Sequence, residues 1–99
     1  METVRTIDGE IEDIRDRISS TGDSVCELHL NTSGGKEKCF AYADKATIVQ
    51  NLLKKMQELA TRNGAAHIKD LHVRVEVTGI VKNQSSSKDL IVTAVKIQQ

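Results

Sequence analysis

The sequence predicts a mainly β domain: a closed five-stranded Greek-key barrel with one α-helix between strands 3 and 4. Segments that alternate apolar and polar residues recur along the chain, as half-buried strands do. Residues 47–62 alone show helical periodicity, and the first strand is long and holds a glycine that lets it bend between two sheets. With 99 residues, we expect one domain, residues 1–99, and its chief rival is a small α+β sandwich with the same strand count.

The first strand is expected over residues 3–18, TVRTIDGEIEDIRDRI. Its alternation is imperfect, because Gly9 lies inside it and Ile14 follows Ile11 by three residues. A glycine and a change of parity inside a strand indicate a β-bulge or a sharp bend. The next segment, SSTGDS at residues 19–24, is typical of a turn.

Two shorter strands, residues 25–31 and 36–43, form a predicted hairpin that NTSGGK closes around residues 33–34. Alternation places one set of side chains toward the barrel interior: Cys26, Leu28, Leu30, Cys39, Ala41 and Ala43. The other set points outward: Val25, Glu27, His29, Lys36, Lys38, Phe40 and Tyr42.

The α-helix is expected over residues 47–62, TIVQNLLKKMQELATR. Thr47 and Gln50 fit a capping box, although Asp44 is an alternative N-cap. Gly64 follows the last turn, as is normal at a helix end. The apolar residues recur at steps of three and four and form one stripe: Val49, Leu52, Leu53, Met56, Leu59 and Ala60.

The last two strands are expected over residues 71–81, LHVRVEVTGIV, and residues 90–97, LIVTAVKI. Gly79 interrupts the first of them, and KNQSSSKD at residues 82–89 is a polar loop between the two. Leu71, Val73, Val75 and Val77 share one strand face. The order strand, strand, strand, helix, strand, strand is the arrangement of the OB-fold barrel, in which the helix covers one end.

On these segments the chain resembles the OB-fold nucleic-acid-binding domains of the tRNA-anticodon-binding type. The resemblance rests on VRTIDGEIEDIRDR, on CELHL with KCFAYA, and on VEVTGIV with KDLIVTAVKI, and it covers nearly the whole chain. It implies a ligand across the second and third strands, between the loops 19–24 and 82–89. The implied face holds Glu27, His29, Lys36, Lys38, Phe40 and Tyr42. The chain departs from the pattern in having only two aromatic residues and no basic residue in its first loop.

Phe40 and Tyr42 are the two aromatic residues, and they lie two apart on one strand, so they share a face. If Cys39 and Ala41 point into the barrel, both rings are exposed beside the lysines of the same strand. Such rings would stack on bases while the lysines contact phosphates. In the alternative the parity is reversed and the rings fill the core.

The other candidate contacts are less specific. Lys82 and Lys88 flank NQSSS and could close on a phosphate backbone, but such a segment is also typical of a solvated hairpin loop. Arg74 could instead pair with Glu76 or with a neighbouring strand, and His29 could simply be exposed. The complete candidate set for nucleic-acid binding is Phe40, Tyr42, Lys36, Lys38, His29, Arg74, Lys82 and Lys88.

The sequence contains no pattern for catalysis, a cofactor or a metal. It lacks the nucleophile elbow of hydrolases, the Walker phosphate loop and the dinucleotide-binding fingerprint. His67 and His72 lie five apart around Asp70, a spacing that does not converge on one metal ion. We therefore expect no enzymatic activity, no cofactor and no metal.

Cys26 and Cys39 lack the spacing of a metal site, and both belong to the inward set. In a hairpin closed at residues 33–34, Cys26 lies opposite Ala41 and Cys39 opposite Leu28, so the two thiols are diagonal. We expect reduced core cysteines, with a disulfide as the alternative.

The formal net charge is zero, with 14 basic and 14 acidic residues. Residues 1–30 hold eight acids and three bases, whereas residues 31–99 hold six acids and eleven bases. The zero net charge excludes the strongly basic class of nucleic-acid-binding proteins, but the uneven distribution allows a local basic surface. No apolar stretch reaches the roughly 18 residues of a membrane helix, and the N-terminus lacks the apolar core of a secretory signal. A cytoplasmic location is expected, unless a signal has been removed.

These observations predict a binding module whose leading partner is single-stranded DNA or RNA. The alternative is a protein-interaction or scaffold module within a larger assembly, because the net charge is zero. The acidic and basic segments could also drive head-to-tail self-association. Neither expectation involves a membrane.

Overall fold

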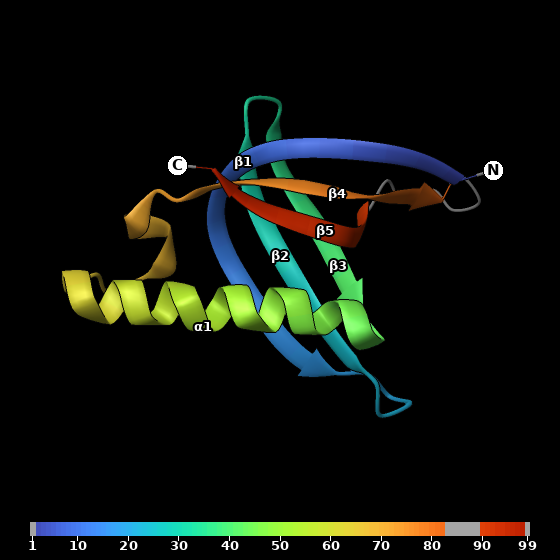
Figure 1. The fold of residues 1–99 in the computed structure, drawn as a ribbon, viewed down its shortest axis with the longest axis horizontal. Coiled ribbons are helices and arrows are strands. Elements are labelled where there is room, and N and C mark those ends of the chain that lie inside the picture. The colour runs from blue at the N-terminus through green and yellow to red at the C-terminus, as the bar shows by residue number, and fades with distance from the viewer. Residues whose placement is uncertain (1, 83–89, 99) are drawn as a thin grey trace.

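The computed structural model describes residues 2–82 and 90–98, which form a closed barrel and one α-helix (Figure 1). The strands are β1 (Glu2–Ile18), β2 (Ser24–Thr32), β3 (Gly35–Tyr42), β4 (Arg74–Lys82) and β5 (Leu90–Gln98). The helices are α1 (Ala46–Asn63) and two short 3-10 helices, η1 (Ala43–Lys45) and η2 (Ile68–Leu71). The strand order β1-β2-β3-β5-β4 and the position of α1 confirm the predicted architecture and correspond to an OB-like fold.

β1 bends so that it can serve both sides of the barrel. Its first half pairs with β4 and its second half with β2, and the register shifts between Ile11 and Asp13. Gly9 lies just before this shift, where the Asn31 carbonyl oxygen would be only 2.7 Å from an added Cβ atom. The predicted bend is therefore confirmed, and the glycine is needed because the backbone of β2 approaches closely.

α1 lies across the barrel below β4 and β5 in Figure 1, and it buries its apolar stripe against the core. Its fully or largely buried residues belong to the same core cluster as the inward side chains of the strands: Ala46, Val49, Leu52 and Met56. The helix ends at Gly64, whose φ of 67° is left-handed and favours glycine. Among the described residues, no helix combines the length and apolar character that crossing a membrane requires.

The predicted capping box of α1 is wrong. The N-cap is Lys45, which makes no side-chain cap hydrogen bond, and α1 continues directly from η1. Because η1 already supplies a turn of helix before Ala46, a cap at Thr47 is not needed. The Gln50 side chain instead donates from Nε2 to Asp16 Oδ1 of β1, 3.3 Å away.

Two strand boundaries also differ from the predictions. Ala43 is exposed in η1 with a φ of 51°, so it does not extend the inward set of β3. Leu71 ends η2, and β4 begins only at Arg74 after His72, whose φ is 52°. At both places the strand pattern meets a 3-10 helix, and a left-handed residue breaks the pattern there.

The β2–β3 hairpin has the predicted register, with Cys26 opposite Ala41 and Leu28 opposite Cys39. Both cysteines are buried thiols and do not form a disulfide. Cys26 Sγ lies 3.4 Å from Asp16 Oδ1 and 3.6 Å from the Ala46 carbonyl oxygen. Burial, together with the hydrogen bond and the negative charge of Asp16, raises the pKa of Cys26 from 9.0 to about 12.

This raised pKa predicts a loss of stability in alkali. Between about pH 9 and pH 12 the unfolded chain releases the Cys26 proton and the folded chain keeps it, so the free energy of unfolding falls as pH rises. The expected slope is up to about 1.4 kcal/mol per pH unit. Urea unfolding at pH 8 and pH 10.5 should show this decline in the wild type and a smaller decline in Cys26→Ala. Equal declines in the two proteins would contradict the prediction.

Candidate functional site

The outer face of β1, β2 and β3 presents four rows of side chains. Each row runs across the three strands and takes one residue from each, because the registers of the β1–β2 and β2–β3 pairs coincide. The rows are Arg17–Val25–Tyr42, Arg15–Glu27–Phe40, Asp13–His29–Lys38 and, beyond the bulge of β1, Glu10–Asn31–Lys36. The candidates Phe40, Tyr42, Lys38 and His29 thus lie together on one surface.

The two rings point outward, as predicted. Cys39 and Ala41 are fully buried, whereas Phe40 is half-buried and Tyr42 is 46% exposed. The ring centroids of Phe40 and Tyr42 are 6.4 Å apart and the planes differ by 19°. The alternative in which the rings fill the core is therefore wrong, and the chain holds a nearly parallel aromatic pair at its surface.

A hollow of about 380 Å³ lies beside the rings. It is bordered by the end of β1 and by the loop that follows, and it is lined by Arg17, Ile18, Ser19, Ser20, Val25, Phe40 and Tyr42. Ile18 is 74% exposed and adds apolar surface at its edge. The loop 19–24 therefore flanks the rings, in the place that the family resemblance implied.

Ion pairs within the face hold most of its charged side chains. Arg17 contacts Glu27 Oε1, and His29 Nε2 lies 3.4 Å from the other oxygen of the same carboxylate. Glu27 belongs to the outward set but is only 8% exposed, because its neighbours in the sheet cover it. Arg15 Nε lies 3.1 Å from Asp13 Oδ2.

The lysines of β3 differ in their partners. Lys36 Nζ lies 2.9 Å from Glu12 Oε1, which the bulge of β1 places on the same face. Lys38 is exposed, and within residues 2–82 and 90–98 it forms no ion pair. Lys38 is therefore a cation near the rings that is available to an anionic ligand.

Arg74 does not belong to this face. Phe40 is opposite Ile91 of β5, whereas Arg74 is opposite Gln98, near the other end of the same strand. That separation along β5 corresponds to roughly 20 Å at the usual rise of a strand. The guanidinium of Arg74 instead lies 3.9 Å from Asp8 of the neighbouring strand β1.

The loop candidates cannot be placed on the face. The backbone of Lys82 ends β4 opposite Glu2, whereas its side chain and the whole of Lys88 lie outside the described residues. The second loop wall implied by the resemblance therefore stays an expectation.

Sequence reasoning missed two basic residues of the face, Arg15 and Arg17. Their spacing of two near the end of β1 was a usable signal, because it places both side chains on one side of a strand. The acidic character of residues 1–30 obscured it. Their position beside Phe40 and Tyr42 depends on the register after the bulge, which the sequence alone does not fix.

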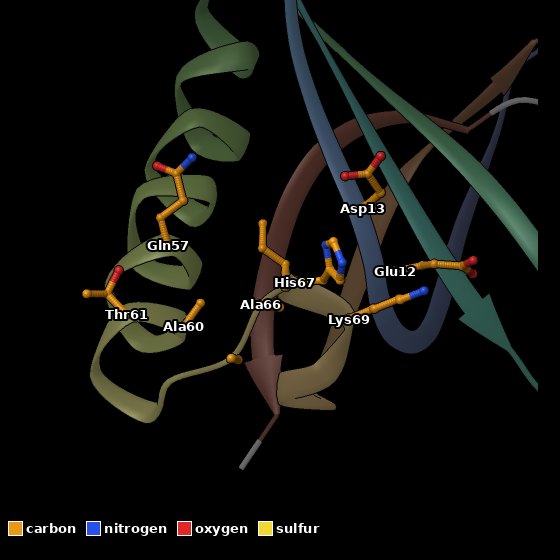
Figure 2. A pocket seen from close by; sticks show the side chains of 10 residues that line it. Glu12, Asp13, Gln57, Ala60, Thr61, Ala66, His67 and Lys69 are labelled. Carbon is orange, nitrogen blue, oxygen red and sulfur yellow. The ribbon is translucent and has the colours of Figure 1, made fainter.

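A more voluminous pocket, about 610 Å³, lies between α1, β1 and the η2 segment (Figure 2). Gln57 and Thr61 line it from α1, Glu12 and Asp13 from β1, and His67 and Lys69 from the segment that contains η2. Among the described residues no group of three or more His, Cys, Asp or Glu side chains is placed to hold a metal ion. The pocket is of mixed charge, and unlike the β1–β3 face it has no aromatic ring in its lining.

No protein-family model matches the chain, and no curated protein is significantly similar to it. The functional interpretation of the β1–β3 face therefore depends on its geometry and chemistry.

Proposed function

We propose that the chain is a non-enzymatic module that binds single-stranded nucleic acid across β2 and β3, in the manner of OB-fold domains of the tRNA-anticodon-binding type. The observation that carries the proposal is the outward pair Phe40 and Tyr42, with centroids 6.4 Å apart, beside a hollow that Arg17 lines. Every base has a flat face, so two nearly parallel rings provide a sequence-tolerant stacking surface.

The charges around the rings support contacts to phosphates of limited strength. Lys38 is available, whereas Lys36, Arg15 and Arg17 are engaged with carboxylates on the same face. A phosphate that contacts one of these engaged side chains must compete with its carboxylate. We therefore expect binding that depends on stacking as well as on charge, with about two to four phosphates contacted.

Fluorescence anisotropy with labelled, mixed-sequence single-stranded DNA and RNA tests this proposal. Because each phosphate contact contributes about −0.7 to the slope for single strands, log K against log salt should have a slope of roughly −1.5 to −3. A duplex of the same sequence should bind more weakly, because its bases are not available to the rings. Absence of binding to both single strands at low salt would refute the proposal.

Removing a competing carboxylate should strengthen the binding. In Glu12→Gln, Lys36 loses its ion-pair partner, 2.9 Å away, and becomes available to a phosphate. The expected gain in affinity is about twofold to fivefold at low salt, and it should vanish at high salt because surface charges are screened. The matched control is Glu58→Gln on α1, an exposed glutamate outside this face. If Glu12→Gln binds no more tightly than Glu58→Gln, Lys36 does not face the ligand.

A protein partner is the second candidate, and an outer apolar row favours it. Registers across β1, β4, β5 and β3 place Val4, Ile80, Ile91 and Phe40 side by side outside the barrel. Val4 is 73% exposed. Exposed apolar surface of this kind is typical of protein interfaces. Titration with the oligonucleotides separates the candidates, because a protein-binding row gives no salt-dependent nucleic-acid affinity.

Self-association has less electrostatic support than the sequence indicated. Ion pairs within the molecule join the acidic first strand to basic residues further along the chain, Asp8 to Arg74 and Glu12 to Lys36. These pairs satisfy part of the charge asymmetry without a second copy. Light scattering of the isolated chain is expected to give a monomer mass.

A further inference from the structure

A groove of about 970 Å³ lies between α1 and the paired ends of β4 and β5, and we call it the α1–β5 groove. In the view of Figure 1, β5 lies between β4 and α1. Buried or half-buried apolar side chains line the groove: Met56, Leu59, Val73 and Ile97. The exposed charged residues that line it are all basic or histidine: Lys55, His72, Arg74 and Lys96. The groove therefore has an apolar floor and a basic rim.

Two of the rim residues contact neighbouring carboxylates. His72 Nδ1 lies 2.9 Å from Glu10 Oε1, and the Arg74 guanidinium lies 3.9 Å from Asp8 Oδ2. These two acids belong to β1 and do not line the groove.

The other two rim residues are available to a ligand. Lys55 lies on α1 and Lys96 on β5, so they stand on different walls of the groove. Glu76 is opposite Lys96 in the β4–β5 register, but in the described part of the chain neither lysine forms an ion pair. An occupant with acidic side chains on both sides would complement them.

One edge of β5 is open beside this groove. β5 pairs with β4 along its length, but with β3 only at Leu90 and Ile91. From residue 92 to residue 98 its other edge has no strand partner among the described residues. Three residues of this stretch, 96–98, line the groove. An unpaired edge exposes backbone donors and acceptors that can accept a further strand.

We propose that the groove binds an extended acidic segment of a partner protein, which adds a strand to the open edge of β5. Backbone hydrogen bonds would supply affinity, and alternate side chains would enter the apolar floor. Acidic side chains between them would reach Lys55 and Lys96. The lysine on the edge disfavours neutral or basic strands, which makes the acidic character a requirement.

A nucleic acid fits this groove poorly. The floor is aliphatic, and both aromatic rings of the chain lie on the β1–β3 face. The inference does not depend on the proposed nucleic-acid function, since it uses different residues on a different surface.

The test uses three synthetic peptides of about seven residues, the length of the open edge. The first alternates glutamate with valine or isoleucine. The second replaces each glutamate with lysine, and the third is the acidic peptide with alternate backbone amides methylated, which removes the donors that a strand needs. Amide chemical shifts of the isotopically labelled chain follow each titration. The acidic peptide should perturb residues 93–98 and 55–59, and the other two peptides should not.

Two charge reversals and a matched control complete the test. Lys55→Glu and Lys96→Glu should each weaken binding of the acidic peptide, together by roughly tenfold or more at low salt. Lys54→Glu changes the adjacent helix residue, which does not line the groove, and should leave the affinity unchanged. All three positions are exposed, so folding is not at risk.

Several results would overturn the proposal. They are the absence of binding by the acidic peptide, equal binding by the methylated peptide, equal weakening by Lys54→Glu, and shifts confined to residues outside the groove. Sedimentation of the chain without peptide should show a monomer. A dimer that Lys96→Glu disrupts would also overturn the proposal, because a second copy of the chain would then occupy the groove.

Discussion

Replacement of both Phe40 and Tyr42 by alanine should lower the affinity for single-stranded oligonucleotides by about 30-fold or more. Each base that stacks on a ring contributes about 1–3 kcal/mol, and both rings are placed to accept one. The loss should persist at high salt, because stacking is not screened as phosphate contacts are. Anisotropy titrations of the double variant and of each single variant measure the effect.

Controls separate stacking from folding and from charge. Phe40→Leu keeps an apolar side chain of similar size without an aromatic face, so it should lose affinity while retaining the unfolding midpoint. Lys38→Gln should weaken binding by about twofold to fivefold and reduce the salt slope by about 0.7, the value for one phosphate contact. If the double ring variant binds as tightly as the wild type, the rings are not the binding surface.

Gly79→Ala should destabilise the barrel by about 2–4 kcal/mol. An added Cβ at Gly79 would lie 2.3 Å from the Ile91 carbonyl oxygen and 2.8 Å from Leu90 Cγ, closer than real Cβ atoms approach. The obstacle is backbone of the paired strand β5, which cannot move aside as a flexible side chain would, so the register at the Thr78–Gly79 shift must change. Urea unfolding followed by circular dichroism measures the loss.

Gly34→Ala provides the matched control for this substitution. Gly34 lies in the hairpin turn, and the nearest atom to an added Cβ is Thr32 Oγ1 at 3.9 Å, an ordinary contact. Its expected change in unfolding free energy is within about 0.5 kcal/mol. If Gly79→Ala costs no more than Gly34→Ala, the close approach of β4 and β5 at this point is wrong.

The architecture could be predicted because the sequence repeats simple periods. Apolar and polar residues alternate along the strands, most clearly in Cys26–Leu30 and Cys39–Ala41, and one segment has a helical stripe. These patterns predicted five strands and one helix in the observed order. The glycines marked the two places where backbones approach closely, Gly9 and Gly79. The helix was predicted to within one residue at each end, but its capping box was wrong because η1 precedes it, and a 3-10 turn has no distinct sequence signature.

The candidate site was predictable only in part. Strand parity placed Phe40 and Tyr42 outside the barrel, since Cys39 and Ala41, which alternate with them, fill the interior. The contribution of Arg17 was not predictable, because it depends on how β1 pairs with β2 after the bulge. Arg74 was grouped with the site for its charge and its outward position on the fourth strand, and the strand register places it at the opposite end of β5.

The central claim is that single-stranded nucleic acid binds on the outer face of β2 and β3. The most direct test is an amide chemical-shift titration of the isotopically labelled chain with a mixed-sequence single-stranded oligonucleotide at low salt. We predict that the perturbed residues cluster at Arg17, Lys38, Phe40 and Tyr42 and that those lining the α1–β5 groove stay unchanged. Perturbations confined to that groove, or none at saturating oligonucleotide, would contradict the claim.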